Sequence, residues 1–189
     1  MASAMNTLQR DLLIETGARI FHERGYAATG VRQVAEAAAV PQGSFTNHFR
    51  SKEAFGQAVL EHYAARLDEI IQQTLGDPSR PPAKRLAAYF EEIEKRVRTQ
   101  DWGIGCLIPD LAAETSSYGD RLRDLLAHVL ERQTASFAAV LREIVDPILA
   151  DDLAGVLLAA WHGTLLRMKV ERSGEPIVRF RKVLDLLIR

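Results

Sequence analysis

The chain of 189 residues contains a single cysteine, so no disulfide can form within it. One lone thiol is typical of proteins from a reducing compartment, and we predict a cytoplasmic location. The sequence has no apolar run of about 18 residues or more, and its start, MASAMNTLQRD, lacks the apolar segment of a signal peptide. We therefore expect no membrane partner.

The sequence also has no large excess of charge of one sign. The formal net charge is −1, so no global positive field indicates a nucleic-acid partner. The local balance differs, because residues 37–52 contain no carboxylate while His48, Arg50 and Lys52 lie in the same stretch. This stretch is the first candidate for contact with a polyanion.

Strand patterns and cofactor motifs are missing as well. No segment of strand length alternates polar and apolar residues, whereas helical periodicity is present throughout. The sequence has neither a glycine-rich phosphate loop nor the spacing of metal ligands, so we predict no metal and no cofactor. We predict an all-α fold.

The N-terminal helices follow from apolar spacing and cap residues. A first helix carries Leu13 and Phe21 on its apolar face and ends near Gly25, a residue suited to the C-cap. A second helix repeats apolar residues over 31–38, with Thr29 as the expected N-cap. Pro41 opens a third, very short helix. Ser51 is then expected to cap a long fourth helix.

The segment GDPSRPP at 76–82 separates this region from a larger helical body. The predicted helices of the body are 83–98, one that begins near Leu107, 121–145, 151–172, and one that follows SGEP at 173–176. Pro109 sets the start near Leu107, because proline is poorly tolerated beyond the first helical turn. We expect two domains, 1–51 and 52–189.

The short helix at 41–49 has the pattern of the second helix of a helix-turn-helix. Phe45 and Phe49 lie four residues apart and can anchor it to the protein. Gly43 permits close approach to a DNA backbone. The remaining side chains can all form hydrogen bonds with bases or phosphates: Gln42, Ser44, Thr46, Asn47 and His48. The alternative is a connecting helix with solvated polar residues.

Residues 10–59 resemble the N-terminal domain of the TetR family of bacterial repressors, along LIETGARIFHERGYAATGVRQVAEAAAVPQGSFTNHFRSKEAF. The resemblance implies a three-helix DNA-binding domain with a helix-turn-helix, followed by a helical-bundle domain for ligand binding and dimerisation. It implies that Arg32, Gln42, Ser44, Thr46 and Asn47 reach the major groove of an operator. His48 and Lys52 would contact phosphates.

The sequence departs from the family at two positions of this domain. Ala39 occupies the turn position that the family usually fills with glycine, which costs about 1 kcal/mol if the backbone is left-handed there. Thr46 replaces a phosphate-binding tyrosine, and its hydroxyl reaches much less far. The operator sequence cannot be read from these residues.

The resemblance also implies dimerisation through the last two helices, roughly 151–172 and 176–188. Apolar residues recur there at helical spacing, and two copies would form a four-helix interface. The predicted interface residues are Leu157, Leu165, Met168, Val183, Leu184 and Leu187. The alternative is that the same residues cover only the core of one protomer.

Cys106 is the candidate sensor residue of the body. It precedes the helix expected from Leu107, where a helix N-terminus favours the thiolate and lowers the thiol pKa. Lys169 shares the apolar face of Trp161 and Leu165, so we expect it to turn inward toward an anion such as that thiolate. GCLIPDLAAE and WHGTLLRMKVERSGEP resemble the electrophile-sensing branch of the family, typified by the repressor of N-ethylmaleimide reductase.

Three functions remain open for the body. The first is a dimeric repressor that leaves its operator when an electrophile or oxidant reacts at Cys106. In the second, the same repressor binds an unreactive apolar molecule in a pocket with Tyr89, Trp102, His128 and Trp161 as candidate contacts. The third, a small helical thiol enzyme with His128 or His162 as the base, lacks any oxyanion device.

Overall fold

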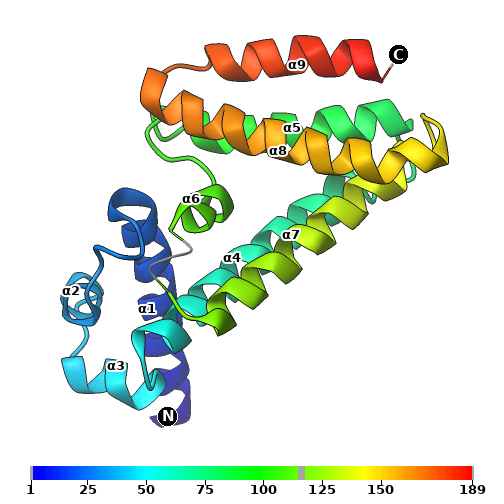
Figure 1. Cartoon of the computed structure of the whole chain (residues 1–189). Helices are drawn as coiled ribbons and strands as arrows, with labels where there is room; N and C mark the ends of the chain where they lie inside the picture. Colours follow the sequence, from blue (N-terminus) through cyan, green and yellow to red (C-terminus); the bar gives the residue numbers. More distant parts are fainter. Residues whose placement is uncertain (1, 115–117, 189) are drawn as a thin grey trace.

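The computed structural model describes residues 2–114 and 118–188, which form nine helices and no strand, confirming the all-α prediction (Figure 1). The helices in chain order are α1 Ala2–Arg24, α2 Val31–Ala37, α3 Gln42–His48, α4 Lys52–Thr74, α5 Pro82–Arg98, α6 Leu107–Ala113, α7 Asp120–Leu141, α8 Pro147–Glu171 and α9 Glu175–Leu187. Helices α1–α3 form a head at one end, and α5, α8 and α9 lie at the other (Figure 1). The long pair α4 and α7 runs between them.

The head is held together by packed phenylalanines. Phe45 and Phe49 on either side of the end of α3 pack against Phe55 of α4, with ring centroids 5.0 Å apart in both pairs. Phe21 of α1 contacts the same Phe55 ring at 5.8 Å. Gly17 of α1 faces that ring so closely that a Cβ there would collide with it, so this glycine lets α1 lie against α4.

The cap residues of the head agree with the sequence in part. The Ser51 side chain accepts a hydrogen bond from the Ala54 N–H at 3.0 Å and caps α4, as predicted. Thr29 is not the N-cap of α2, and that prediction is wrong. The Thr29 hydroxyl donates to the Gly25 carbonyl at 2.6 Å, and α2 begins after Gly30 instead.

The turn between α2 and α3 contains the strained residue that the sequence predicts. Ala39 has a φ of 54°, in the left-handed region where glycine is favoured. Its N–H donates to the Glu36 carbonyl and the Val40 N–H to the Ala35 carbonyl, which closes the end of α2. The chain then enters α3 through Pro41, which lies at the N-cap position, one residue before the first helical residue.

The body contains an aromatic core and one boundary that differs from the prediction. Phe90, Trp161 and Phe180 of α5, α8 and α9 pack within 5.0 Å of one another by ring centroid. Helix α8 begins at Pro147, four residues before the predicted 151. Asp146 caps it by accepting from the Ile148 N–H, and proline at the first helical position needs no partner for its absent N–H.

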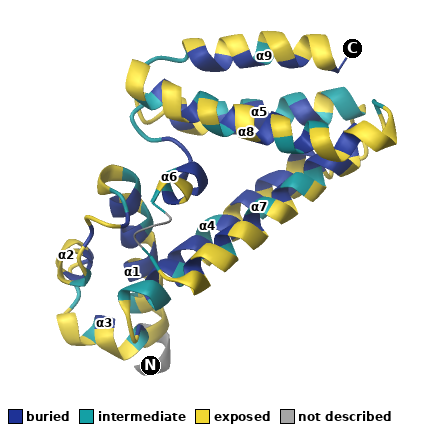
Figure 2. Ribbon diagram, in the orientation of Figure 1, coloured by how far each residue is buried: buried dark blue, intermediate teal, exposed yellow. Residues whose placement is uncertain are grey.

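Much of the predicted dimer interface lies inside the protomer, which corrects that prediction. Four of its residues are buried in the core of the protomer: Leu157, Leu165, Met168 and Leu184. Val183 and Leu187 are exposed. Among the described residues, α8 is long and apolar enough to cross a membrane by length and composition alone, yet it packs between α7 and α9 and keeps an exposed outer face (Figure 2).

Candidate DNA-binding face and effector cavity

Helix α3 presents one polar face to solvent. Phe45 and Phe49 are 1% and 5% exposed and fix the opposite side of the helix. Gln42, Thr46 and Asn47 are exposed, and nothing lies within 4 Å of the position that a Cβ of Gly43 would take. This face has the shape and chemistry that a major groove requires.

The other predicted base contacts are engaged within the protein. Arg32 on α2 is exposed, and its guanidinium pairs with Glu36 one turn later at 2.7 Å. Ser44 is half-buried, with its hydroxyl 3.2 Å from the Gln9 side chain, and the Thr46 hydroxyl donates to the Gly43 carbonyl. The contact uses Nε of Arg32 and one oxygen of Glu36.

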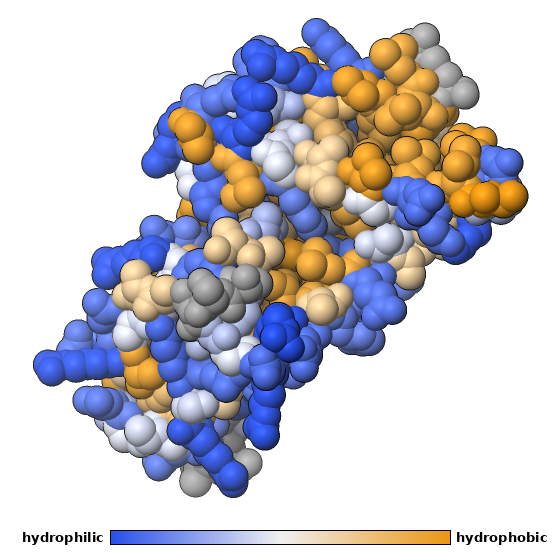
Figure 3. Space-filling model, viewed as in Figure 1, coloured by the Kyte–Doolittle hydropathy of each residue, from blue (hydrophilic) through white to orange (hydrophobic). Residues whose placement is uncertain are grey.

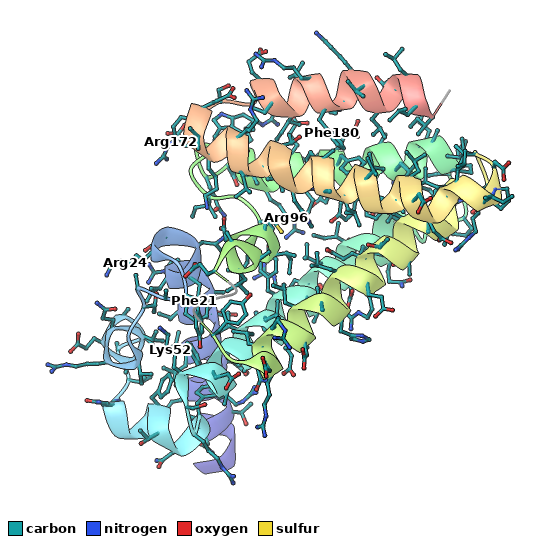
Figure 4. The ribbon with its side chains drawn as sticks, viewed as in Figure 1. Phe21, Arg24, Lys52, Arg96, Arg172 and Phe180 are labelled. Carbon is teal, nitrogen blue, oxygen red and sulfur yellow. The ribbon has the colours of Figure 1, made fainter. Side chains whose placement is uncertain are left out.

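The two predicted phosphate contacts face the protein. The Lys52 ammonium donates to the Ala27 carbonyl at 3.0 Å and lies 4.5 Å above the Tyr26 ring (Figure 4). Burial lowers the pKa of Lys52, and the carboxylate of Glu114 opposes that shift. His48 is half-buried, with its Nε2 enclosed and without a hydrogen-bond partner among the described residues.

A cavity of about 420 Å³ lies where α1, α4, α5 and α8 meet the segment before α6. Tyr89 and Trp161, two of the predicted effector contacts, line it. Trp102 and His128 do not, which corrects the other half of that prediction. Trp102 packs beside Gly174 in the connection between α8 and α9, and His128 is 62% exposed on the outer side of α7.

Sequence reasoning missed several lining residues. His22, Tyr63 and Arg96 come from α1, α4 and α5, and Figure 4 shows Arg96 near α6. None of them belongs to a motif, because the cavity exists only through the packing of separate helices. His162 was considered only as a base, although it lines the cavity too. Burial lowers its pKa to about 4, so the ring is neutral at physiological pH.

Cys106 lines the cavity, and its burial opposes the thiol activation that the sequence predicts. It is buried at the N-cap position of α6, and burial raises its pKa to about 11. The Tyr63 hydroxyl donates to its sulfur at 3.4 Å, which favours the thiolate too weakly to reverse that shift. Desolvation outweighs the helix N-terminus here, so Cys106 is a neutral thiol at pH 7.

Lys169 turns inward as expected, but toward a different anion. Its ammonium binds both carboxylate oxygens of Asp110, at 2.8 and 2.9 Å, and not the sulfur of Cys106. His22 Nδ1 of α1 lies 3.5 Å from the same carboxylate. Burial alone would raise the pKa of Asp110, but the His22 ring and the Lys169 ammonium outweigh it and hold that pKa below its ordinary value.

Helix α6 joins the cavity to the head. It begins after Cys106 at the cavity wall, and Glu114 is its C-cap residue. The Glu114 carboxylate accepts hydrogen bonds from the backbone N–H groups of Tyr26 and Ala27, at 3.0 and 2.7 Å. These two residues belong to the connection between α1 and α2, so one side chain of the body fixes the loop that leads into the helix-turn-helix.

Comparison with known proteins agrees with this arrangement. Residues 13–59 match the family described as "Bacterial regulatory proteins, tetR family", and residues 82–183 match "Transcriptional regulator LmrA/YxaF-like, C-terminal domain". Within the described part of the chain, no group of three His, Cys, Asp or Glu side chains could hold a metal ion.

Two curated relatives and one solved structure are similar over nearly the whole chain. The HTH-type transcriptional repressor DhaR of Mycobacterium sp. (strain GP1) is 41% identical over 180 residues, which cover 92% of this chain and 89% of that protein. The HTH-type transcriptional repressor NemR of Escherichia coli (strain K12) is 33% identical over 183 residues, covering 89% and 87%. The crystal structure of regulatory protein TetR from Rhodobacter sphaeroides superposes with a TM-score of 0.89 at 31% identity, covering 94% and 97%.

Proposed function

The chain belongs to the TetR family of bacterial transcriptional regulators, and we propose that it is a cytoplasmic homodimeric repressor released from its operator by a small molecule. The observation that carries this proposal is the continuous connection from the cavity, through α6, to the Glu114 contact with the head. A ligand acts on DNA binding only if it prefers one of two states of the protein. Because the cavity touches the start of α6, a bound ligand can favour one of these two states.

Operator recognition is assigned to the exposed face of α3, together with Arg32 and Lys52. We propose that Gln42, Thr46 and Asn47 contact base edges or the adjacent backbone, with Gly43 allowing close approach. A single face of this size reads only one half-site. Two heads, about 34 Å apart, are needed to read two successive half-sites.

The dimer is proposed to form through the outer faces of α8 and α9. Once the residues buried in the protomer are set aside, the exposed large apolar side chains of these two helices are Ile148, Leu149, Val156, Leu166, Val170, Val178, Val183, Leu186 and Leu187. Figure 3 shows hydrophobic surface gathered over the region where the start of α8 and the end of α9 lie. A contiguous apolar surface on two neighbouring helices is a typical interface between copies.

We favour a noncovalent effector over an electrophile. At pH 7 a thiol with a pKa of about 11 is ionised in roughly one molecule in ten thousand, which makes Cys106 a poor nucleophile. The electrophile remains a second candidate for one reason: Cys106 lines the same cavity, so any reactive molecule that enters would reach its sulfur.

The test begins with duplexes selected from a random pool on the immobilised protein. We expect enrichment of a two-fold symmetric sequence, bound by two protomers and strongly dependent on salt concentration. Absence of any enriched sequence would contradict the proposed operator binding. With the selected duplex, N-ethylmaleimide then separates the two effector candidates.

We expect N-ethylmaleimide to release the duplex slowly or not at all at pH 7, because Cys106 is protonated. The matched variant is Cys106→Ser, which keeps a small polar side chain but removes the sulfur. Fast release of the unmodified protein, lost in Cys106→Ser, would establish the electrophile instead. Intact-mass measurement records whether the sulfur has been alkylated.

A further inference from the structure

We propose that the cavity binds an uncharged, mainly apolar molecule with one hydrogen-bond acceptor, such as a ketone oxygen, and that the Tyr89 hydroxyl is its donor. This inference rests on the ligand-responsive function proposed above and names the chemical class of the ligand. It is carried by a cavity-lining hydroxyl that makes no hydrogen bond to the described residues, by three neutral polar groups in the same cavity, and by the apolar character of the remaining wall.

Tyr89 offers a donor that the protein does not use. The residue is 2% exposed and lines the cavity, yet its hydroxyl makes no hydrogen bond to any of the described residues. The ring is fixed from behind by Phe90 and Phe137, with centroids 5.4 and 4.9 Å away in edge-to-face contacts. Buried tyrosine hydroxyls normally have a partner. Here a ligand oxygen is the partner that the cavity can admit.

Three polar groups that line the cavity with Tyr89, those of Tyr63, Cys106 and His162, are uncharged at neutral pH, and a fourth, His22, faces the Asp110 carboxylate at 3.5 Å. Burial raises the pKa of both Tyr63 and Cys106, and it lowers that of His162. Tyr63 already donates to the Cys106 sulfur, so its hydroxyl proton is engaged. An ionised ligand group placed here would lose its hydration without meeting an opposite charge. The inner wall therefore selects against carboxylates and ammonium groups.

The rest of the inner wall is apolar. Ile93, Val97 and Trp161 line it and are nearly fully buried, and Leu165 closes it from α8. A volume of about 420 Å³ falls within the range of pockets that enclose drug-sized molecules. Such a wall favours a ligand with a bulky hydrocarbon part of one or two rings.

Charged side chains do line the cavity, but on its exposed side. Arg19, Arg66 and Arg96 are all exposed to solvent, as is Glu15. Arg19 pairs with Glu23 at 2.9 Å and Arg96 with Glu92 at 3.3 Å, each within its own helix. Exposed guanidinium groups, two of which are already paired here, attract an anion only weakly. An anionic ligand held by these three arginines is the rival, and the experiment includes it.

The experiment compares three probes that share a naphthalene ring: 2-acetonaphthone, 2-isopropenylnaphthalene and 2-naphthoate. They present a ketone, a methylene group in its place, and a carboxylate. Isothermal titration calorimetry on the DNA-free protein measures each dissociation constant at pH 7. We expect the ketone to bind about tenfold more tightly than either other probe, which corresponds to about 1.4 kcal/mol.

Two matched variants assign the donor. Tyr89→Phe should remove the preference for the ketone over the alkene while leaving alkene binding unchanged. Tyr63→Phe removes a hydroxyl from the same cavity that already has a partner, and it should keep the preference. Unchanged alkene binding in Tyr89→Phe also shows that the variant has folded with its cavity intact.

Three results would overturn the inference: tightest binding of 2-naphthoate, a ketone preference that survives Tyr89→Phe, or no binding of any probe at 1 mM, which is about the upper limit for a weak specific ligand. Failure of the proposed function can be told apart from failure of this ligand inference. It would appear as loss of sequence-specific DNA binding, which is measured separately and without these probes.

Discussion

The sequence predicts the position of Lys52 at the start of a helix, but it does not predict the contacts of the Lys52 side chain. The N-cap Ser51 and the start of α4 follow from local chemistry, because a serine side chain bonds to an N–H three residues later. The carbonyl that accepts a hydrogen bond from the Lys52 ammonium belongs to Ala27, 25 residues away, and no local sequence pattern predicts this contact. Thr29 was misplaced by one residue: its hydroxyl donates to the Gly25 carbonyl at the end of α1, and Gly30 is the N-cap of α2.

We predict that Lys52→Ala weakens binding to all duplexes by a similar factor and lowers the salt slope by about one unit, because one phosphate contact is lost. Fluorescence anisotropy over a range of salt concentrations measures the slope. Lys182→Ala on α9 is the control, since it removes an exposed lysine far along the chain from the head. An unchanged slope would assign Lys52 to the Ala27 and Tyr26 contacts alone.

Ala39→Gly should stabilise the protein by about 0.5–1 kcal/mol. The left-handed backbone at Ala39 costs an L-residue more than the added flexibility of glycine costs the unfolded chain. Ala65→Gly, at an exposed position in the middle of α4, is the matched control and should destabilise by about 1 kcal/mol. Urea denaturation compares the two. If both substitutions lowered the free energy of unfolding, Ala39 would not be strained.

At the scale of elements, periodicity identifies a helical face but not what covers it. Leu157, Leu165 and Met168 were correctly placed on one face of α8, yet that face packs on the core of the same protomer. The start of α8 was missed for a different reason. Asp146 and Pro147 together form an N-cap and first-turn signature that lies outside the apolar pattern.

Glu114→Ala should expose the loop between α1 and α2 and lower stability by about 1–2 kcal/mol, because two N–H groups lose a charged acceptor. Hydrogen exchange at the Tyr26 and Ala27 amides is the direct measurement, and we expect protection at both to fall. Glu131→Ala on the exposed side of α7 should change stability by less than about 0.5 kcal/mol. Retained protection at both amides would refute the proposed role of Glu114.

At the scale of the whole molecule, family membership and fold were predictable because 50 consecutive residues, 10–59, carry a pattern specific to the family. The cavity was predictable only through Tyr89 and Trp161. Its other walls come from α1, α4 and the segment before α6, which are brought together by packing alone. The pKa of Cys106 depends on that packing too, so a rule based on the helix N-terminus gave the wrong direction.

Leu186→Asp should convert the dimer to monomer, because a carboxylate would be desolvated in the proposed interface of α8 and α9. Leu186 is 68% exposed in the protomer, so the change should leave its fold intact. Leu8→Asp on α1 is the control, at a leucine that is 69% exposed but lies in the head. Light scattering after size-exclusion chromatography gives the mass. A Leu186→Asp protein that stays dimeric would place the interface elsewhere.

Helix α4 starts in the head at Lys52, ends in the body at Thr74, and packs on α1 as well as on α5 and α7. At about 1.5 Å per residue, its 23 residues form a lever about 35 Å long. Tilting that lever by about 5° would swing one end by about 3 Å, or about 6 Å across two protomers. One base pair occupies about 3.4 Å along DNA, so a tilt of this size would shift the spacing of two heads by more than one base pair relative to their half-sites.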